Sequence, residues 1–230
     1  MRRLYDRFPN KTIQRDDLIS LYREWADLGL CFIATMVWGG IDTTKQQRLQ
    51  NLLTVPEKAM AERMRKTKLL IKRGLYPLAF ISWSRGGENN IDGISYSFFS
   101  KIFFFIGQSM RSLKEKPLIL DKWTCNAFFV LFTQTVGLAV SKELFYIPSR
   151  EGFEKYRMVY PKTGNNAFVY TLYVKHMNYW ADALKIFPGQ LEQFLFGVDL
   201  RRDNSQTNPR NEFSKMILDV IEQRHQPEAE

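Results

Sequence analysis

Apolar positions recur along most of the chain with the period of an amphipathic α-helix. The pattern predicts helices over residues 16–37, 45–53, 56–73, 77–84, 96–109, 122–140, 167–186, 188–195 and 211–224. A shorter helix is expected near 151–157, inside an irregular stretch that contains proline and tyrosine. We therefore predict an all-α protein. Residues 1–225 are expected to form one domain of two helical lobes with a cleft between them, and residues 226–230 a frayed tail.

A polar stretch with three glycines, residues 85–95, separates two of the predicted helices. It is too short to be a linker between domains, so it predicts a helix–hairpin–helix arrangement. The backbone N–H groups at the start of the second helix can bind a DNA phosphate in such an arrangement.

Composition and charge narrow the class of protein. Hydrophobic residues make up 45% of the chain and aromatic residues 14%, which is typical of a folded protein. The formal net charge of +9 favours a polyanionic partner such as nucleic acid. Cys31 and Cys125 lie in apolar helical stretches without metal-ligand spacing, which predicts reduced core thiols in a cytosolic protein and no metal site. No apolar stretch resembles a signal peptide or a membrane span.

The helix predicted over 56–73 holds a run of basic residues: Arg63, Arg65, Lys66, Lys68, Lys72 and Arg73. Such a run is typical of a solvated helix face, and it is also compatible with contacts to phosphates. The sequence leaves both interpretations open.

Lys101 and Asp121 are the residues that point to covalent chemistry. Lys101 lies among aromatic residues, where desolvation is expected to lower the pKa of its amine and make it nucleophilic. Asp121 precedes a predicted helix, whose dipole and unpaired N–H groups would keep a carboxylate ionised. An activated amine facing a fixed carboxylate suits Schiff-base chemistry at a sugar carbon. The alternative is a lysine that extends to solvent beside an ordinary helix cap.

Gly93 in the hairpin, Lys101 in the following helix and Asp121 twenty positions later resemble the helix–hairpin–helix DNA glycosylase superfamily. The segments Phe98-Phe99-Ser100-Lys101 and Leu118-Ile119-Leu120-Asp121-Lys122 are most similar to its 8-oxoguanine DNA glycosylase branch. The resemblance implies that Lys101 attacks C1′ of a damaged nucleotide and that Asp121 stabilises the cationic sugar. It also implies that no metal or organic cofactor takes part.

Further segments extend the resemblance to the recognition of DNA. The turn at Trp38, Gly39 and Gly40 is similar to the wedge that fills the gap left by a flipped base. Asp182, in Trp180-Ala181-Asp182-Ala183, stands where the family reads the Watson–Crick edge of guanine, and its two oxygens suit the N1–H and N2–H₂ donors. A solvent-facing helix residue is the other interpretation of Asp182. The family's stacking position is Ile186 here, and either Phe187 beside it or Phe105 on the lysine helix is expected to stack on the base.

The sequence departs from the family pattern at several positions. The second hairpin glycine is Ser95, and the strict position of the lysine is Ser97, so that Lys101 lies one helical turn further along the same face. Trp123 stands where relatives have a phosphate-binding histidine. The chain begins directly with predicted helices, without the strand-rich N-terminal domain that discriminates 8-oxoguanine in eukaryotic-type members. The discriminating contact is therefore expected to come from elsewhere, or the substrate is a different guanine-type base.

The sequence supports two classes of function. The first is a bifunctional DNA glycosylase and AP lyase that acts on an 8-oxoguanine-like base in double-stranded DNA. It is expected to be a monomer in the bacterial cytoplasm, at the nucleoid, with no membrane partner. The second is a repurposed helix–hairpin–helix module that binds a modified guanine nucleotide or DNA, for example in a bacterial antiphage defence system. Retention of both Lys101 and Asp121 favours the first, and Ser95 in the hairpin favours the second.

Overall fold

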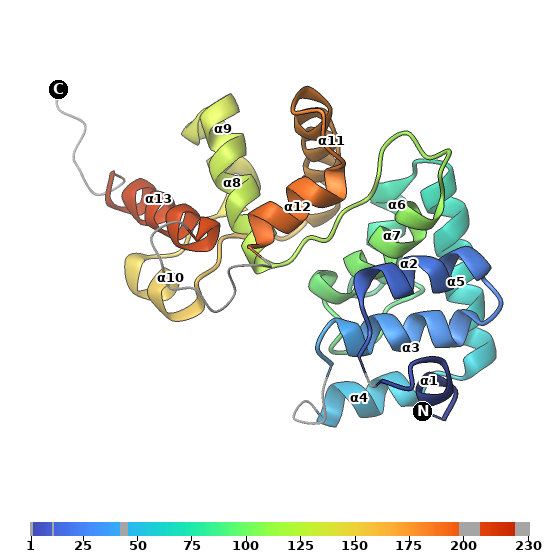
Figure 1. Ribbon diagram of the computed structural model, residues 1–230. Coiled ribbons are helices and arrows are strands. Elements are labelled where there is room, and N and C mark those ends of the chain that lie inside the picture. The colour runs from blue at the N-terminus through green and yellow to red at the C-terminus, as the bar shows by residue number, and fades with distance from the viewer. Residues whose placement is uncertain (1, 11, 42–45, 198–207, 224–230) are drawn as a thin grey trace, which may run out of the picture. The chain divides into compact units, whose positions relative to one another are not determined.

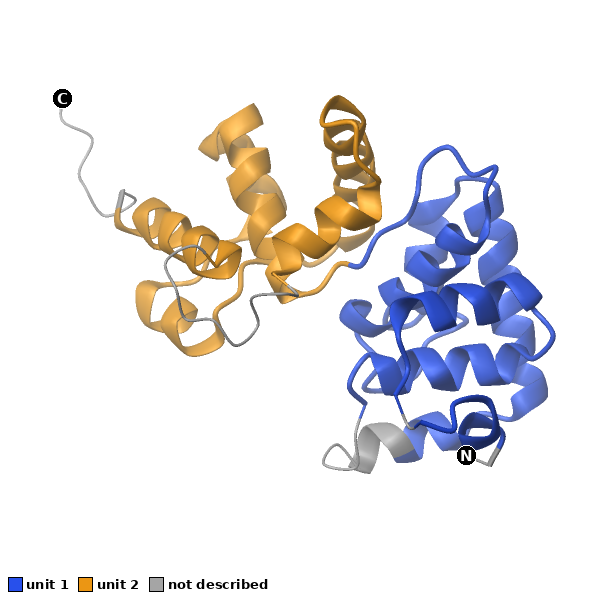
Figure 2. Cartoon of the chain, viewed as in Figure 1, with its two compact units in different colours: residues 1–119 blue, residues 120–230 orange. Residues whose placement is uncertain are grey.

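The computed structural model describes residues 2–10, 12–41, 46–197 and 208–223, and these form thirteen α-helices and one short two-stranded sheet (Figure 1). The predicted all-α class is confirmed. The chain divides into two compact units, unit 1 (Met1–Ile119) and unit 2 (Leu120–Glu230), which are coloured separately in Figure 2. Among the described helices, none combines the length and the apolar character needed to cross a lipid bilayer. The predicted tail, 226–230, lies outside the described residues.

The described residues of unit 1 form seven helices, the last of which is largely buried. These are α1 (Arg2–Arg7), α2 (Arg15–Glu24), α3 (Leu28–Trp38), α4 (Gln46–Leu53), α5 (Glu57–Lys72), α6 (Tyr76–Trp83) and α7 (Tyr96–Ser109). Helix α7 packs against α2, α3, α5 and α6. Its aromatic run is buried, and Phe99 meets Phe80 of α6 edge to face with 4.9 Å between ring centroids. Burial of these large rings stabilises the unit.

The single helix predicted over 16–37 is wrong, because the chain breaks between α2 and α3. Trp25 adopts a left-handed backbone conformation, with φ of 50°, and its N–H bonds to the carbonyl of Leu21. Asp27 then starts α3 by accepting a hydrogen bond from the N–H of Leu30 at 2.9 Å. An aspartate cap of this kind satisfies an N–H group that the helix leaves unpaired. The apolar rhythm runs through the break, which is why periodicity alone did not reveal it.

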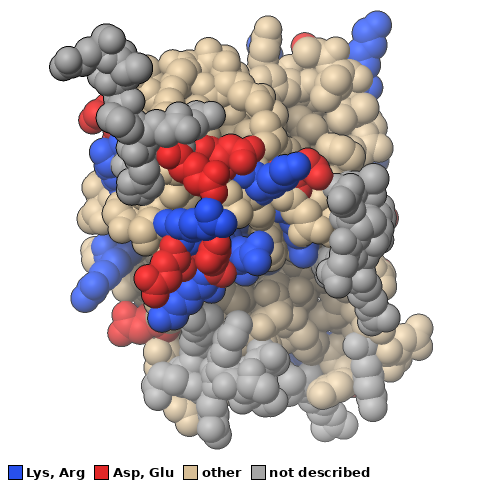
Figure 3. Space-filling model, turned by 90° about the vertical axis from the view of Figure 1, so that its left-hand side faces the viewer, with Lys and Arg blue, Asp and Glu red and all other residues tan. Residues whose placement is uncertain are grey.

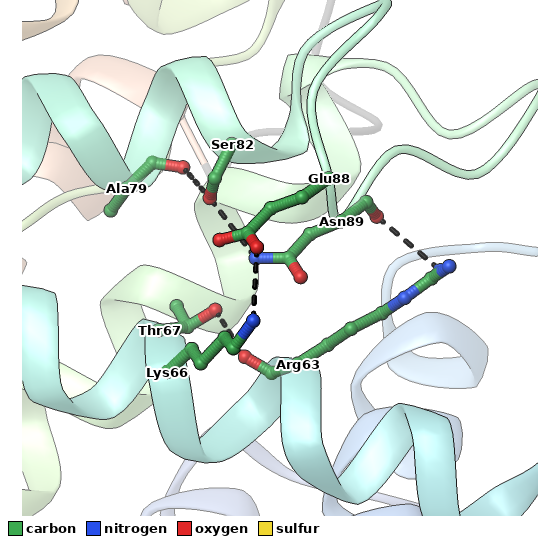
Figure 4. A network of polar contacts seen from close by, with 7 residues as sticks. All are labelled: Arg63, Lys66, Thr67, Ala79, Ser82, Glu88 and Asn89. Atoms are coloured by element: carbon green, nitrogen blue, oxygen red, sulfur yellow. Dashed lines mark hydrogen bonds and ion pairs between the residues drawn. The ribbon is translucent and has the colours of Figure 1, made fainter.

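A polar network fastens the chain after α6 to helix α5 (Figure 4). The side chain of Asn89 is buried and donates to the hydroxyl of Ser82 at 3.1 Å. Lys66 of α5 pairs with Glu88 at 2.9 Å, and Arg63 donates to the carbonyl of Asn89 at 3.4 Å. Two of the basic residues of α5 therefore hold the start of the hairpin segment in place.

Unit 2 consists of α8 (Lys122–Val136), α9 (Leu138–Leu144), β1 (Phe145–Tyr146), α10 (Arg150–Tyr156), β2 (Tyr160–Pro161), α11 (Asn166–Ala183), α12 (Pro188–Phe196) and α13 (Pro209–Gln223). Helix α8 packs against α9, α12 and α13. The strands are antiparallel, with Phe145 opposite Pro161. Buried Asn126 of α8 donates to the carbonyl of Arg157 and accepts from the N–H of Val159, both at 2.9 Å, which fixes the segment before β2.

The predicted helix over 122–140 is too long. Gly137 has φ of 86°, which ends α8 and lets α9 begin in a new direction. The short helix α1 and the two strands were not predicted. The other helices begin and end close to their predicted bounds. The single domain with a cleft between its lobes stays a prediction.

Candidate active site

Lys101 lies on α7 and its side chain turns back towards the start of that helix. Its Nζ donates a hydrogen bond to the carbonyl of Ser97, one helical turn earlier. This direction is expected because side chains on a helix tilt towards its N-terminus. The residue is half-buried, and its amine lies 5.3 Å from the centre of the Phe98 ring. The amine is thus held at the turn that contains the family's strict lysine position.

The hairpin before α7 is a tight turn that glycine makes possible. The N–H of Ile94 bonds to the carbonyl of Ile91 at 3.0 Å, and Gly93 takes φ of 86°. The side chain of Asn51 on α4 donates to the carbonyl of Asp92 at 3.0 Å and fixes the turn from outside. These contacts fix the turn from which the chain enters α7 at Tyr96.

Ser95 precedes α7 as its N-cap residue, and its side chain makes no cap hydrogen bond. Its hydroxyl instead bonds to the hydroxyl of Ser97 at 2.9 Å. Both hydroxyls are thus at the start of α7, beside the carbonyl that holds the amine of Lys101.

The predicted wedge is a Schellman turn that ends α3. The N–H of Gly40 bonds to the carbonyl of Val37, and the N–H of Ile41 to that of Met36, each at 3.0 Å. Gly40 has φ of 84°, in the left-handed region. Gly39 faces the lysine, because a β-carbon placed on it would lie 3.0 Å from Cδ of Lys101 and 3.4 Å from Cε.

The aromatic residues around this turn connect it to α7. Trp38 meets Phe105 edge to face at 5.1 Å, and Phe105 also stacks on Tyr22 at 5.7 Å. Phe105 is completely buried, so this ring, one of the two predicted to stack on a base, is part of the hydrophobic core. Arg15 was missed by the sequence analysis. Its guanidinium lies 4.6 Å from the ring centre of Phe104 and 5.7 Å from that of Trp38.

Asp121 is the N-cap of α8, as predicted. Its Oδ1 accepts from the N–H of Trp123 at 2.9 Å and from that of Thr124 at 3.1 Å. The hydroxyl of Thr124 in return accepts from the N–H of Asp121 at 2.9 Å, which completes a capping box. The hydroxyl of Thr124 also lies 3.3 Å from Oδ1. These contacts fix the carboxylate at the start of α8 through its Oδ1 atom.

Buried polar groups lie behind this cap, and the sequence analysis missed them. The hydroxyl of Tyr173 on α11 hydrogen-bonds to the side chain of Thr124. Burial raises the pKa of Tyr173 well above its usual value, and the negative charges of Glu192 and Asp121 raise it further. Glu192 of α12 is itself only 1% exposed. A glutamate at that position looks like an ordinary helix-surface residue in the sequence, and only tertiary packing buries it.

Trp123, the residue in place of the family's histidine, lies between two cations. The amine of Lys122 is 4.3 Å from the ring centre and the guanidinium carbon of Arg210 is 4.7 Å from it. Arg210 also lies 4.4 Å from the ring of Phe196. Packing of α13 against α8 brings this arginine to the start of α8, a contact that the sequence did not predict.

The predicted base-recognition residues of unit 2 gather at the corner between α11 and α12. The helix ends at Ala183, earlier than predicted, because Lys185 takes φ of 56° and the N–H of Ile186 bonds back to the carbonyl of Ala181. Asp182 is exposed in the last turn of the helix. Phe187 follows the corner with 76% of its surface exposed, and Ile186 with 39%. Phe187, unlike Phe105, therefore has a ring that a ligand can reach.

Charge on the surface is mixed rather than uniformly basic. On the face in Figure 3, lysine and arginine side chains lie among aspartate and glutamate side chains. In unit 2, for example, Arg150 pairs with Glu154 at 3.0 Å and with Glu222 at 2.5 Å. On α5, Lys68 packs over the ring of Trp25 at 3.8 Å, and burial lowers its pKa. Several residues of the basic run on α5 thus make contacts within the fold.

A comparison with protein families decides the classification of the chain. The family model described as "Putative 8-oxoguanine DNA glycosylase OGG-like protein" matches residues 2–196. The chain belongs to this OGG-like family. The resemblance to the 8-oxoguanine branch is thereby confirmed. No curated protein and no solved structure matches the chain.

The match places the candidate site residues of both units within the OGG-like region. Lys101, the hairpin and the Trp38–Gly40 turn belong to unit 1, whereas Asp121, Trp123 and Asp182 belong to unit 2. Arg210 lies beyond the matched residues. The predicted approach of Lys101 and Asp121 to each other stays a prediction.

Proposed function

We propose that this OGG-like protein is a bifunctional DNA glycosylase and AP lyase that removes an oxidised or modified guanine-type base from duplex DNA. The observation that carries the proposal is the hydrogen bond from Nζ of Lys101 to the carbonyl of Ser97. Lys101 lies four residues after Ser97, the position of the lysine in the family pattern. The hydrogen bond brings the amine of Lys101 back to the helical turn that contains Ser97. Membership of the family supports DNA as the partner.

The chemistry assigned to Lys101 begins with loss of a proton, because an ammonium has no lone pair. The neutral Nζ forms a bond to C1′ while the bond from C1′ to the base breaks. The electron pair of that bond leaves with the base, which takes up a proton. Nζ then loses a further proton, and its lone pair forms a double bond to C1′ as the C1′–O4′ bond breaks. The electron pair of that bond stays on O4′, which takes up a proton, and the product is a protonated Schiff base. Removal of a proton from C2′ then expels the 3′-phosphate.

Asp121 is assigned to the stabilisation of the positive charge that develops on the sugar. The two backbone N–H bonds to Oδ1 support this role, because they hold the carboxylate in one orientation. A charge held in place before the reaction stabilises the transition state more than one that must reorient.

Recognition of the base is assigned to the corner between α11 and α12. Asp182 is exposed there and offers two acceptor oxygens, which matches the two adjacent donors on the Watson–Crick edge of guanine. Phe187 is the exposed ring at the same corner and suits stacking on an extruded base. Ile186 contributes apolar surface beside it.

Contacts to the DNA backbone are assigned to three places. The hairpin residues Gly93, Ser95 and Ser97 present the N-terminus of α7 to a phosphate. The Trp38–Gly40 turn would fill the space of the extruded nucleotide. Trp123, with the cations of Lys122 and Arg210 on it, would replace the phosphate contact of the family's histidine.

Borohydride trapping tests this function. Duplex DNA with 8-oxoguanine opposite cytosine is incubated with the native chain, with Lys101→Gln and with Lys155→Gln, an exposed lysine of α10 that serves as control. An adduct with the native chain and with Lys155→Gln, but not with Lys101→Gln, is expected. A second duplex with an abasic site separates lyase activity from base excision.

The binding module remains the second candidate, and one observation favours it. The hairpin carries Ser95 where the family has glycine, and its hydroxyl is bonded to Ser97 close to the phosphate-binding N–H groups. A chain that binds both duplexes without forming an adduct would have this function, and a role in antiphage defence would then be examined.

A further inference from the structure

The turn that ends α3 lies against the side chain of the candidate nucleophile. A β-carbon on Gly39 would lie 3.0 Å from Cδ and 3.4 Å from Cε of Lys101. The first of these distances is shorter than ordinary van der Waals contact between carbon atoms, and the second is at the lower limit of that contact. The stem of Lys101 therefore occupies the space that the missing side chain of Gly39 leaves.

The two neighbouring glycines of the turn are needed for different reasons. Gly40 has φ of 84° and no atom within 4 Å of its missing β-carbon, so the backbone conformation alone explains it. Gly39 has φ of −71° and ψ of −3°, which any residue adopts. The backbone does not require glycine at position 39, but the stem of Lys101 leaves less space there than a β-carbon normally has.

We propose that the Trp38–Gly40 turn is a positioning element for Lys101, in which the absence of a side chain at Gly39 sets the place of the amine. The proposal rests on the proposed function, because it assigns the turn a role in the covalent step as well as in DNA contact. The carbonyl of Thr35 lies 3.1 Å from the same β-carbon position and belongs to the backbone of α3. The flexible lysine stem is thus the neighbour that must move when a side chain is added.

Neighbouring aromatic contacts tie the same turn to the lysine helix. Trp38 packs on Phe105, one turn after Lys101 on α7, and Arg15 lies over both Trp38 and Phe104. A displacement of the turn by DNA is therefore transmitted to α7 at two places, at the stem of Lys101 and at Phe105. Insertion of the wedge and placement of the amine are coupled in this arrangement.

Gly39→Ala is the variant that tests the coupling, and Gly74→Ala is its control. Gly74 follows α5 with φ of 70° and has no atom within 4 Å of its missing β-carbon, so alanine there strains the backbone without touching Lys101. Two rates are measured in each variant. The first is acetylation of Lys101 by acetic anhydride in the free protein, relative to Lys155, by peptide mass spectrometry. The second is borohydride trapping on an abasic-site duplex at saturating protein, with the Kd for the duplex measured separately.

In Gly39→Ala, acetylation of Lys101 is expected to be about fivefold faster, because displacement of the stem breaks its hydrogen bond to Ser97. Trapping is expected to be about tenfold slower at an unchanged Kd, because the amine is misplaced relative to C1′. Gly74→Ala should match the native chain in both rates. Native rates in Gly39→Ala, or equal changes in Gly74→Ala, would overturn the positioning role.

The two measured rates, acetylation and borohydride trapping, separate this proposal from the proposed function. If the native chain forms no adduct on any duplex, the glycosylase and lyase function fails, but acetylation of Lys101 still decides the positioning role. Faster acetylation in Gly39→Ala alone would then support the role, and an unchanged rate would refute it.

Discussion

Substitution of Asp121 separates its two roles, the cap of α8 and the carboxylate of the proposed reaction. Asparagine keeps an Oδ1 that accepts from the N–H groups of Trp123 and Thr124, now at 2.9 and 3.1 Å, and it removes only the charge. Alanine removes both the acceptor and the charge. Comparison of Asp121→Asn with Asp121→Ala therefore separates the effect of the charge from the effect of the helix cap.

The expected magnitudes follow from these contacts. Asparagine caps a helix about as well as aspartate, so only the interaction with the helix dipole, about 0.3–1 kcal/mol, is lost. Alanine leaves two N–H groups without their acceptor and costs about 1–2 kcal/mol. For a chain of this length, each kcal/mol lowers Tm by about 2–4 °C. Loss of the carboxylate charge is expected to slow the covalent step about 10²–10³-fold in both variants.

Thermal melting and single-turnover excision, measured on the same preparations, test this expectation. Asp121→Asn should melt close to the native chain, and Asp121→Ala a few degrees lower, about 2–8 °C. Both should bind the duplex with nearly native Kd and react slowly. An asparagine variant that reacts at the native rate would show that Asp121 acts as a cap alone, and the electrostatic role would be refuted.

Four further results are expected. Lys101→Gln should abolish the borohydride adduct while the Kd for duplex DNA, measured by fluorescence anisotropy, stays within about threefold because only one positive charge is lost. Gly93→Ala should lower the free energy of unfolding by about 1–2 kcal/mol in urea titrations, because an L-residue is strained at φ of 86°. Phe187→Ala should leave Tm unchanged and weaken base excision, whereas Phe105→Ala should cost about 3–5 kcal/mol of stability, because only the second ring is buried. Burial raises the pKa of the Cys31 thiol from 9.0 to about 12, so the folded chain keeps a proton that the unfolded chain loses above pH 9. The contribution of this thiol to the free energy of unfolding should therefore be fully present below pH 9 and decrease as the pH rises towards 12. Melting curves between about pH 8 and 10.5 would show this as a falling Tm.

Most helices were predictable because the signals that define them are local. The apolar period, the Asp121 cap and the glycine of the hairpin each act within a few residues of the chain. The predictions failed where the backbone changed direction without a change of period. The break at Trp25 is the clearest case, because tertiary packing holds a tryptophan in a conformation that glycine usually adopts.

The sequence also predicted which residues are candidates for the site, but not whether each is buried or what it contacts. Phe105 and Phe187 are the same residue type and each is next to an isoleucine, yet one is buried and the other is largely exposed. The contact between Gly39 and Lys101 joins two helices far apart in the sequence, and so does that between Trp123 and Arg210. No local pattern carries such information, because it depends on how elements pack.

The sequence by itself therefore determined the all-α class, the OGG-like family resemblance, and the lysine, the aspartate and the hairpin as the candidate machinery. Those features depend on residue type and on spacing along one segment. Only the tertiary structure decided that the amine of Lys101 turns back to Ser97 over Gly39, that Arg15 joins Trp38 to α7, and that Glu192 is buried near Tyr173. Those features depend on the packing of side chains from distant segments, which settles their exposure and direction only once the core has formed.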